Sequence, residues 1–214
     1  SVRDGRLYMS NESASEVVAL RQTGKDVPDD LHYTVEADIT CQEGAASIVF
    51  NAANTKNFYL FQLNKDNDDG KVWFKPHTWK NNGFAIYGSH VKDATELVGG
   101  AEAFKTVPAH IKIDVTALEI KTYINGTLLD TFPFKETQGI APVPGYIGIR
   151  SSDTERFTAD NLKMTDLSGR IPKVVYDYTF DDPDDNPFLF GSIENGVFEA
   201  NGDGVLLPPL GSPT

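Results

Sequence analysis

One stretch of strict alternation constrains the fold of this 214-residue chain more than any other feature. Between residues 33 and 41 every second side chain is apolar and those between are polar: Tyr33, Val35, Ala37, Ile39 and Cys41 against Thr34, Glu36, Asp38 and Thr40. Side chains of a strand point alternately to opposite sides, so the pattern predicts a strand with one buried face and one face open to water or ligand. Helical periodicity is almost absent from the rest of the chain.

Shorter runs of the same kind recur, separated by clusters of Gly, Asn, Asp and Pro. The further strands that they predict are Leu7–Met9, Val17–Leu20, Ala46–Asn51, Phe58–Leu63, Val72–Lys75, Ile111–Val115, Glu119–Ile124, Leu128–Phe134, Tyr146–Arg150 and Ala159–Thr165. The dipeptide Asn125-Gly126 is a strong hairpin signal, because both residues tolerate a positive φ. Many short strands joined by turns favour an all-β, antiparallel β-sandwich of jelly-roll type.

The pattern changes near residue 168. The stretch Leu167–Pro172 has linker character, and an acidic segment with Asp181, Asp182, Asp184 and Asp185 follows it. We therefore expect a sandwich domain over residues 1–167. Residues 168–214 are expected to be a linker and tail that either adds strands to the sandwich or begins a further domain.

Composition excludes several classes of partner and site. The formal charge of −12 repels phosphate backbones and anionic lipid, so we expect neither nucleic acid nor membrane as a partner. No apolar run approaches the roughly 20 residues that span a bilayer. Cys41 is the only cysteine, which leaves no intrachain disulfide and no cysteine-based zinc site. We expect a monomer that is secreted or extracytoplasmic. The excess of acidic residues is compatible with that location but does not require it.

Catalytic motifs are scarce in the sequence. It contains neither the Gly-x-Ser-x-Gly nucleophile turn nor a phosphate-binding Gly-x-x-x-x-Gly-Lys loop. Glu36 and Asp38, both on the outward face of one predicted strand, are the best pair of carboxylates for a glycoside hydrolase or lyase. Polar residues in such positions are more often only solvated.

The run Asp66-Asn67-Asp68-Asp69-Gly70 has the oxygen-rich side chains that Ca²⁺ prefers. It makes Asp66 and Asp68 candidate metal ligands. The run does not complete an EF-hand, because no Glu stands at the twelfth position from Asp66. A polar hairpin tip explains the same residues without a metal.

Sugar binding requires an aromatic platform with amides and charged groups around it. Residues 73–79, Trp-Phe-Lys-Pro-His-Thr-Trp, supply these types within one stretch. Alternation sends Phe74 to the core and Trp73, Lys75 and His77 to the opposite face, with Trp79 entering a polar loop. An exposed tryptophan there favours a ligand, although both tryptophans could instead close the edges of the sandwich.

Several of these runs resemble a known family of sandwich modules. The residues that carry the resemblance are 45–51 (AASIVFN), 57–63 (NFYLFQL), 121–130 (KTYINGTLLD), 145–150 (GYIGIR), Glu155 with 159–162 (ADNL), and the tail residues 176–180 (YDYTF), 186–188 (NPF) and 194–196 (ENG). Taken together they resemble concanavalin-like and laminin-G-like sandwiches. They are most similar to the L-rhamnose-binding module, carbohydrate-binding module family 67, of family 78 α-L-rhamnosidases.

That resemblance implies a module that binds terminal L-rhamnose, or a related sugar of plant polysaccharides, with the help of Ca²⁺ and without catalysis. The family contacts its sugar through an Asp-Asn pair, which here is Lys56-Asn57. The Lys56 ammonium could hydrogen-bond hydroxyls or pair with a uronic acid. The carbohydrate-binding residues that we predict are Asn51, Asn57, Gln62, Lys75, His77, Trp79, Tyr87 and Arg150. The alternatives are a β-sandwich glycoside hydrolase or polysaccharide lyase, and a laminin-G-like protein-interaction domain.

Overall fold

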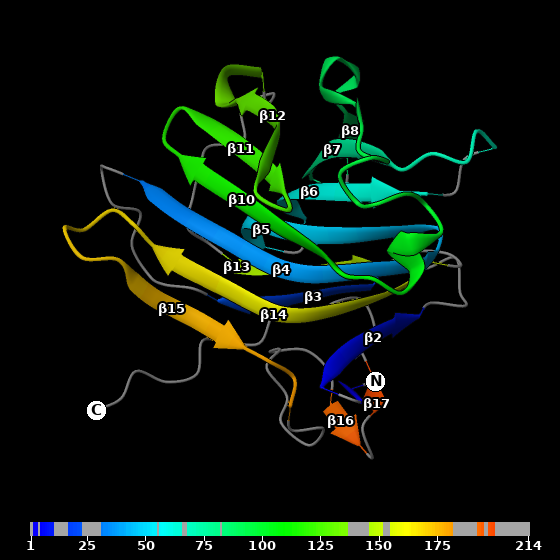
Figure 1. Ribbon diagram of the computed structural model, residues 1–214. Helices are drawn as coiled ribbons and strands as arrows, with labels where there is room; N and C mark the ends of the chain where they lie inside the picture. Colours follow the sequence, from blue (N-terminus) through cyan, green and yellow to red (C-terminus); the bar gives the residue numbers. More distant parts are fainter. Residues whose placement is uncertain are drawn as a thin grey trace.

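The computed structural model is a β-sandwich in which every strand pairing is antiparallel. It describes residues 2–3, 5–10, 17–22, 31–54, 56–65, 68–81, 83–136, 146–151, 155–181, 192–194 and 197–199. Two large sheets lie one behind the other as layers, with β4, β10 and β14 in the front layer of Figure 1 and β5, β6 and β13 behind them. The predicted fold class is thereby confirmed.

The front layer, sheet A, has eight strands. In spatial order they are β1 (Val2–Arg3), β2 (Arg6–Ser10), β14 (Arg156–Asp166), β4 (His32–Glu43), β10 (Ala109–Thr116), β11 (Glu119–Ile124) and β12 (Thr127–Pro133), with β15 (Lys173–Tyr178) also paired to β14.

The back layer, sheet B, has seven strands. In spatial order they are β3 (Val17–Gln22), β13 (Tyr146–Ser151), β5 (Ala45–Asn54), β6 (Asn57–Asn64), β7 (Trp73–Lys80) and β8 (Gly83–Ile86), with β9 (Lys92–Asp93) paired to the other end of β7. Each predicted strand overlaps one of these strands. Three short 3-10 helices, η1 (Gly88–His90), η2 (Ala103–Lys105) and η3 (Phe134–Glu136), complete the connections. Over the described ranges, no helix has the length and apolar character needed to cross a membrane.

The core lies between the inner faces of the two sheets. In β4 the predicted buried face is confirmed, because Tyr33, Val35, Ala37, Ile39 and Cys41 are all buried. The opposite face is open only at its centre, where Glu36 and Asp38 are partly exposed, since Thr34 and Thr40 are buried as well. Aromatic rings join the layers: the ring centroid of Phe61 in sheet B lies 4.7 Å from Phe50, 5.2 Å from Phe74 and 6.1 Å from Phe132 of sheet A. Such tilted and edge-on pairs contribute about 0.5–1.5 kcal/mol each beyond the area that they bury.

The predicted turn at Asn125-Gly126 is also confirmed. Both residues have positive φ, 49° and 80°, and they connect β11 to β12. The Asn125 side chain then ties the turn to its surroundings. Its amide donates to Leu97 O at 2.8 Å, and its oxygen accepts from the His110 amide at 2.9 Å.

Sheet A continues past the predicted domain boundary at residues 167 and 168. The strand β15 pairs with β14 beyond that point, and the Leu167 amide donates to His32 O at 2.8 Å. Phe180 is 1% exposed and belongs to the core. The structure therefore shows the tail adding a strand to the sandwich. Further along, β16 (Ser192–Glu194) and β17 (Val197–Glu199) form a separate two-stranded sheet.

Candidate functional site

Strand register arranges the outer face of sheet B into three rows that run across the strands. The polar row consists of Arg150, Ser47, Gln62 and Lys75; the middle row of Gly148, Val49, Leu60, His77 and Ile86; and the aromatic row of Phe58, Trp79 and Phe84. The polar and aromatic rows are separated by four residues along β6 and β7, which at about 3.3 Å per residue is about 13 Å.

A carboxylate from outside the strands completes the polar row. Glu155, in the segment between β13 and β14, accepts from Gln62 Nε2 at 3.2 Å and from a guanidinium nitrogen of Arg150 at 3.3 Å. The Arg150 and Glu155 side chains are 11% and 12% exposed. A carboxylate taken this far out of water needs a charged partner and hydrogen bonds, and this site supplies both.

Gly44 allows Glu155 to approach. A Cβ built on Gly44 would lie 3.1 Å from Glu155 Cγ and 3.2 Å from Glu155 Cα, and the backbone there has a φ of +68°. Glycine meets both requirements at once, since it has no side chain to clash and it adopts positive φ readily.

The middle row is covered rather than open. Val49 and Leu60 are 0% and 1% exposed, and His77 is 3% exposed. Burial lowers the pKa of His77 to about 4. The hydrogen bond between its Nδ1 and the Lys75 carbonyl, at 2.7 Å, raises the pKa but does not offset the effect of burial. His77 is therefore a neutral packing residue at pH 7, with its ring stacked on Phe84 at 4.9 Å.

Exposure rises towards β8, where the aromatic row meets solvent. Phe84 is 53% exposed and Ile86 is 48% exposed, while Trp79 is half-buried. The Trp79 ring stacks on the buried Phe58 at 5.8 Å and 4°, and lies 5.7 Å from Phe84 at 59°. Phe58 holds the indole from behind, so this surface is fixed before any ligand arrives.

The structure brings five of the eight predicted sugar-binding residues to this one face: Gln62, Lys75, His77, Trp79 and Arg150. Of these, Lys75 and Trp79 are partly accessible. Gln62 and His77 are buried, and the Arg150 side chain is mostly so.

Asn51 lies apart from these five residues. Asn51 is 1% exposed and has a φ of 49°, in a stretch of β5 where the pairing with β6 and β13 shifts register. Its backbone takes part in a hydrogen bond with the buried Tyr33, whose pKa burial raises. Asn51 thus lies in a bulge of β5 with its side chain buried.

Tyr87 and Asn57 also lie away from the other five residues. The Tyr87 ring packs edge-on against Phe132 of the core at 4.9 Å, and its hydroxyl is 2.9 Å from Thr78 Oγ1 on the inner side of β7. Asn57 begins β6 with the opposite parity to Gln62, and its side-chain oxygen accepts from the Asn81 amide at 3.2 Å. Asn57 therefore ties the start of β6 to the turn between β7 and β8.

Sequence reasoning missed Phe84 and Glu155 as parts of this face. Phe84 could have been found, because the turn after Trp79-Lys80 places it directly across from Trp79 once β8 is recognised. Glu155 gave no comparable signal, since it reaches Gln62 across 93 residues of sequence.

The predicted calcium ligands, Asp66 and Asp68, stand in the sequence between β6 and β7. Among the residues that the structure describes, no group of three or more His, Cys, Asp or Glu side chains is placed to hold a metal ion. The predicted ligand Asp66 lies outside the described residues, and Asp68 is exposed. The oxygens of neighbouring Asp69 accept from the Lys71 amide and from Trp73 Nε1, both at 2.9 Å, so that carboxylate closes the hairpin tip.

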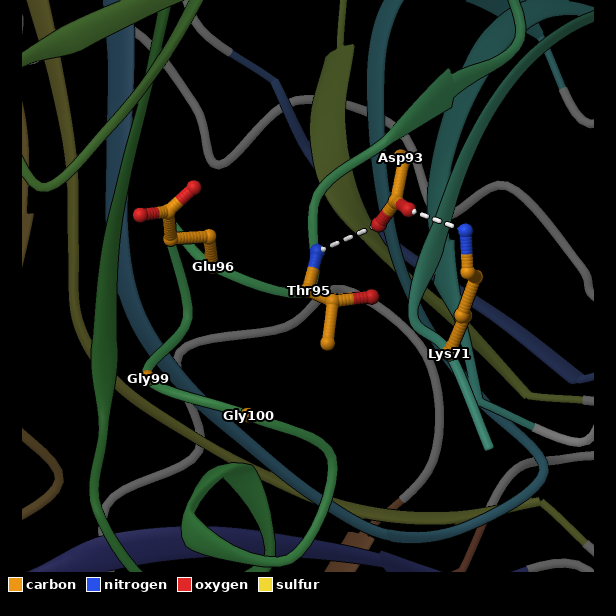
Figure 2. Close-up of a pocket in the computed structure, with 6 residues that line it drawn as sticks. All are labelled: Lys71, Asp93, Thr95, Glu96, Gly99 and Gly100. Atoms are coloured by element: carbon orange, nitrogen blue, oxygen red, sulfur yellow. Dashed lines mark hydrogen bonds and ion pairs between the residues drawn. The ribbon is translucent and has the colours of Figure 1, made fainter. Parts of the chain in front are cut away.

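A cavity of about 700 Å³ opens beside this tip. It is lined by Lys71, Asp93, Thr95, Glu96, Gly99 and Gly100 (Figure 2). Asp93 lies between its two partners, 2.8 Å from the Lys71 ammonium and 3.0 Å from the Thr95 amide, with Glu96 on the far side of the opening. The hydrogen bond from Lys71 is the main reason that the pKa of Asp93 falls to about 2. These described lining residues include hydrogen-bonding groups but no aromatic ring on which a sugar could stack.

The carboxylates considered for catalysis lie on the outer face of sheet A and share one partner. His110 Nδ1 is 2.8 Å from Asp38, and His110 Nε2 is 3.3 Å from Glu36. Asn161 donates to the second oxygen of Asp38 at 2.7 Å. The two carboxylates thus hold the imidazole between them, and these contacts describe a surface hydrogen-bond network.

Comparison with family models gave no match, and neither did comparison with curated proteins. Among solved structures, the chain is similar to the carbohydrate-binding module CBM66 from Bacillus subtilis, with a TM-score of 0.48 and 15% identity over 73% of this chain and 94% of the module. It is also similar to sheep galectin-11 in complex with glycerol (0.47, 12% identity, 69% and 96%) and to a protein of unknown function with a galectin-like fold from Bacillus subtilis (0.48, 11% identity, 74% and 97%). At these identities the likeness concerns the fold alone.

Proposed function

We propose that this chain is a non-catalytic carbohydrate-binding domain whose ligand lies on the outer face of sheet B, along β7 and β8. The observation that carries the proposal is the aromatic row. Phe84 exposes 53% of its surface beside a half-buried Trp79 that Phe58 holds from behind. Exposing large aromatic side chains to water is unfavourable, and sugars cover them through the apolar faces of their rings.

The polar row supplies the second requirement of a sugar site. Lys75 is a donor at the partly accessible end of that row, next to Gln62. The separation of about 13 Å between the rows exceeds the width of one sugar ring, so a ligand that reaches both must contain more than one sugar unit. Because few groups on this face are accessible to a ligand, we expect weak binding, with dissociation constants of roughly 10 µM to 1 mM.

The resemblance to family 67 modules makes terminal L-rhamnose the first sugar to test. Calcium belongs in the same test, because that family uses it. A loss of affinity after EDTA would show that a metal ion contributes to binding.

Titration calorimetry with a panel of oligosaccharides tests the proposal, with L-rhamnose measured in Ca²⁺ and again after EDTA. The informative variant is Phe84→Ala, because the ring is half exposed and its loss should leave the fold intact. We expect binding to weaken by about tenfold or more, equivalent to about 1.4 kcal/mol. Leu118→Ala is the matched control, an exposed apolar side chain (78%) in the turn between β10 and β11, and it should bind like the parent.

Unchanged binding by Phe84→Ala would place the ligand elsewhere and refute the proposal. Turnover of an oligosaccharide that disappears in Glu36→Gln would favour the hydrolase or lyase alternative instead. Silence across the glycan panel, together with tight capture of a defined protein that depends on Phe84 and Ile86, would favour a protein-interaction domain.

A further inference from the structure

The cavity lined by Lys71 and Asp93 lies at the opposite end of β7 from the aromatic row. Trp73 and Trp79 have the same parity on β7, and the pairing of β7 with β6 shows no register shift, so both side chains lie on the outer face of sheet B. They are six residues apart, which is about 20 Å at roughly 3.3 Å per residue. Asp93 in β9 stands directly opposite Trp73 and therefore lies on the same face.

One wall of the cavity is an ion pair whose position is fixed by its neighbours. The Lys71 ammonium is 2.8 Å from Asp93 and 5.3 Å from the centroid of the Trp73 ring. Trp73 Nε1 in turn donates to Asp69 at 2.9 Å. The side chains of Lys71 and Asp93 are nevertheless 46% and 39% exposed. These contacts hold the ammonium and the carboxylate in place while leaving both open to a ligand.

The other wall is the loop of residues 94–100, which turns back on itself. The Gly100 amide donates to the Thr95 carbonyl at 2.8 Å. Thr95 also joins the two walls, because its amide donates to Asp93 at 3.0 Å and its Oγ1 accepts from the Val72 amide at 2.9 Å (Figure 2). The shape of the cavity is thus set by the fold before any ligand binds.

The cavity presents donors and acceptors of opposite charge close together. Lys71 carries three hydrogens on its ammonium, and the carboxylates of Asp93 and Glu96 only accept. The hydrogen bond from Lys71 holds the pKa of Asp93 at about 2, so this carboxylate is ionised at pH 7. A charged ligand of either sign would meet a group of its own sign here, whereas a sugar hydroxyl both donates and accepts. The chemistry therefore favours a neutral ligand with several hydroxyls.

We infer that the ligand of this domain is an extended, neutral oligosaccharide held at both ends of β7. One of its rings stacks on Trp79 and Phe84, and the hydroxyls of a later unit hydrogen-bond to Lys71, Asp93 and Glu96 in the cavity. This inference rests on the proposed carbohydrate-binding function. The aromatic row supplies the stacking that the described lining of the cavity does not. The domain then recognises a stretch within a polysaccharide chain, because a single sugar unit occupies only one of the two places.

The first test varies the length of the ligand. Calorimetry would use galactan, arabinan and xylan oligosaccharides, from the monosaccharide to the hexasaccharide, with L-rhamnose alongside. A disaccharide is too short to span about 20 Å, so its hydroxyls cannot reach the cavity while it stacks on the aromatic row. Once a ligand spans both places, its second contact is intramolecular. We expect the hexasaccharide of the bound series to bind at least about tenfold more tightly than the disaccharide.

The second test places the ligand by fluorescence. The chain has two tryptophans, and one stands at each end of the inferred site. Trp79→Phe leaves Trp73 as the reporter beside the cavity, and Trp73→Phe leaves Trp79 as the reporter in the aromatic row. The hexasaccharide should change the emission of both reporters, and the disaccharide only that of Trp79.

Substitutions in the cavity separate a contact with the ligand from an effect on the fold. Asp93→Asn keeps an oxygen for the Thr95 amide but removes the charge, and Glu96→Ala removes an exposed carboxylate. Each should weaken hexasaccharide binding by about tenfold and leave the affinity for the disaccharide unchanged. Glu102→Ala is the matched control, because Glu102 follows the same loop, is 84% exposed and does not line the cavity. It should bind like the parent.

Equal affinity for the disaccharide and the hexasaccharide would overturn the inference and leave the proposed function standing. So would Trp73 emission that the hexasaccharide does not change, or losses in Asp93→Asn and Glu96→Ala no larger than that in Glu102→Ala. Binding of L-rhamnose with none of the three series bound would also overturn it. Failure of the folded protein to bind any oligosaccharide would refute the proposed function itself.

Discussion

Acidification should destabilise the folded protein through His77. The unfolded imidazole titrates near 6.5, and burial lowers the pKa in the folded chain to about 4. Between these two values the unfolded chain takes up a proton that the folded chain does not. The unfolding free energy is therefore unaffected by His77 protonation above pH 7. It falls as the pH drops through 6 and 5, and the full decrease is reached below about pH 4.

The size of the effect follows from the difference between the two pKa values. At about 1.4 kcal/mol per pKa unit, the fall from 6.5 to about 4 corresponds to about 3 kcal/mol of unfolding free energy. That is a large part of the roughly 5–15 kcal/mol that stabilises a typical domain.

Urea denaturation at pH 7, 6, 5 and 4 measures this contribution when the parent is compared with His77→Asn. The asparagine amide can donate to the Lys75 carbonyl, as Nδ1 of His77 is placed to do, but it does not titrate. Every other titratable group is the same in the two proteins, so its contribution cancels in the difference. The parent should lose about 3 kcal/mol more than the variant between pH 7 and 4. Parallel losses would show that His77 is not held neutral in the folded state.

Two further substitutions test packing in the sandwich. Thr122 Oγ1 is buried without a hydrogen-bond partner, so Thr122→Val should raise the unfolding free energy by about 1–2 kcal/mol, and a lower urea midpoint would show that the hydroxyl is satisfied after all. Gly44→Ala should lower the unfolding free energy by about 1–2 kcal/mol because the backbone there has a positive φ. The close contact of the added carbon with Glu155 should lower it further. Gly70→Ala has a similar φ of +70° and nothing within 4 Å of the added carbon, so equal melting shifts for these two alanine variants would rule out the contact with Glu155.

The strands could be predicted because their signals are local. The alternation over residues 33–41 fixed which side of β4 is buried, and Asn125-Gly126 fixed a turn. In both cases the residues that decide the structure are neighbours in the sequence. A period of two and a positive φ are properties of a short segment, whatever surrounds it.

The candidate site could be predicted only in part, because its contacts are long-range. Parity placed Lys75 and His77 on the correct face of β7, but it could not show that His77 is 3% exposed. A register shift in β5 removes Asn51 from the alternation, so parity alone could not place its side chain. The pairing of Glu155 with Gln62 depends on how distant segments meet, and no spacing in the sequence encodes it.

Both sheets join strands from the beginning of the chain to strands made much later. β2 pairs with β14 in sheet A, and β3 pairs with β13 in sheet B, while β4 lies between β10 and β14. During synthesis β4 therefore keeps an open hydrogen-bonding edge until residues 156–166 have been added. Contacts between such distant segments make folding slow, and an open edge invites association with other chains in the meantime. A fragment that stops before Arg156 would lack the neighbour on one side of β4, so it should aggregate rather than fold into a smaller sandwich.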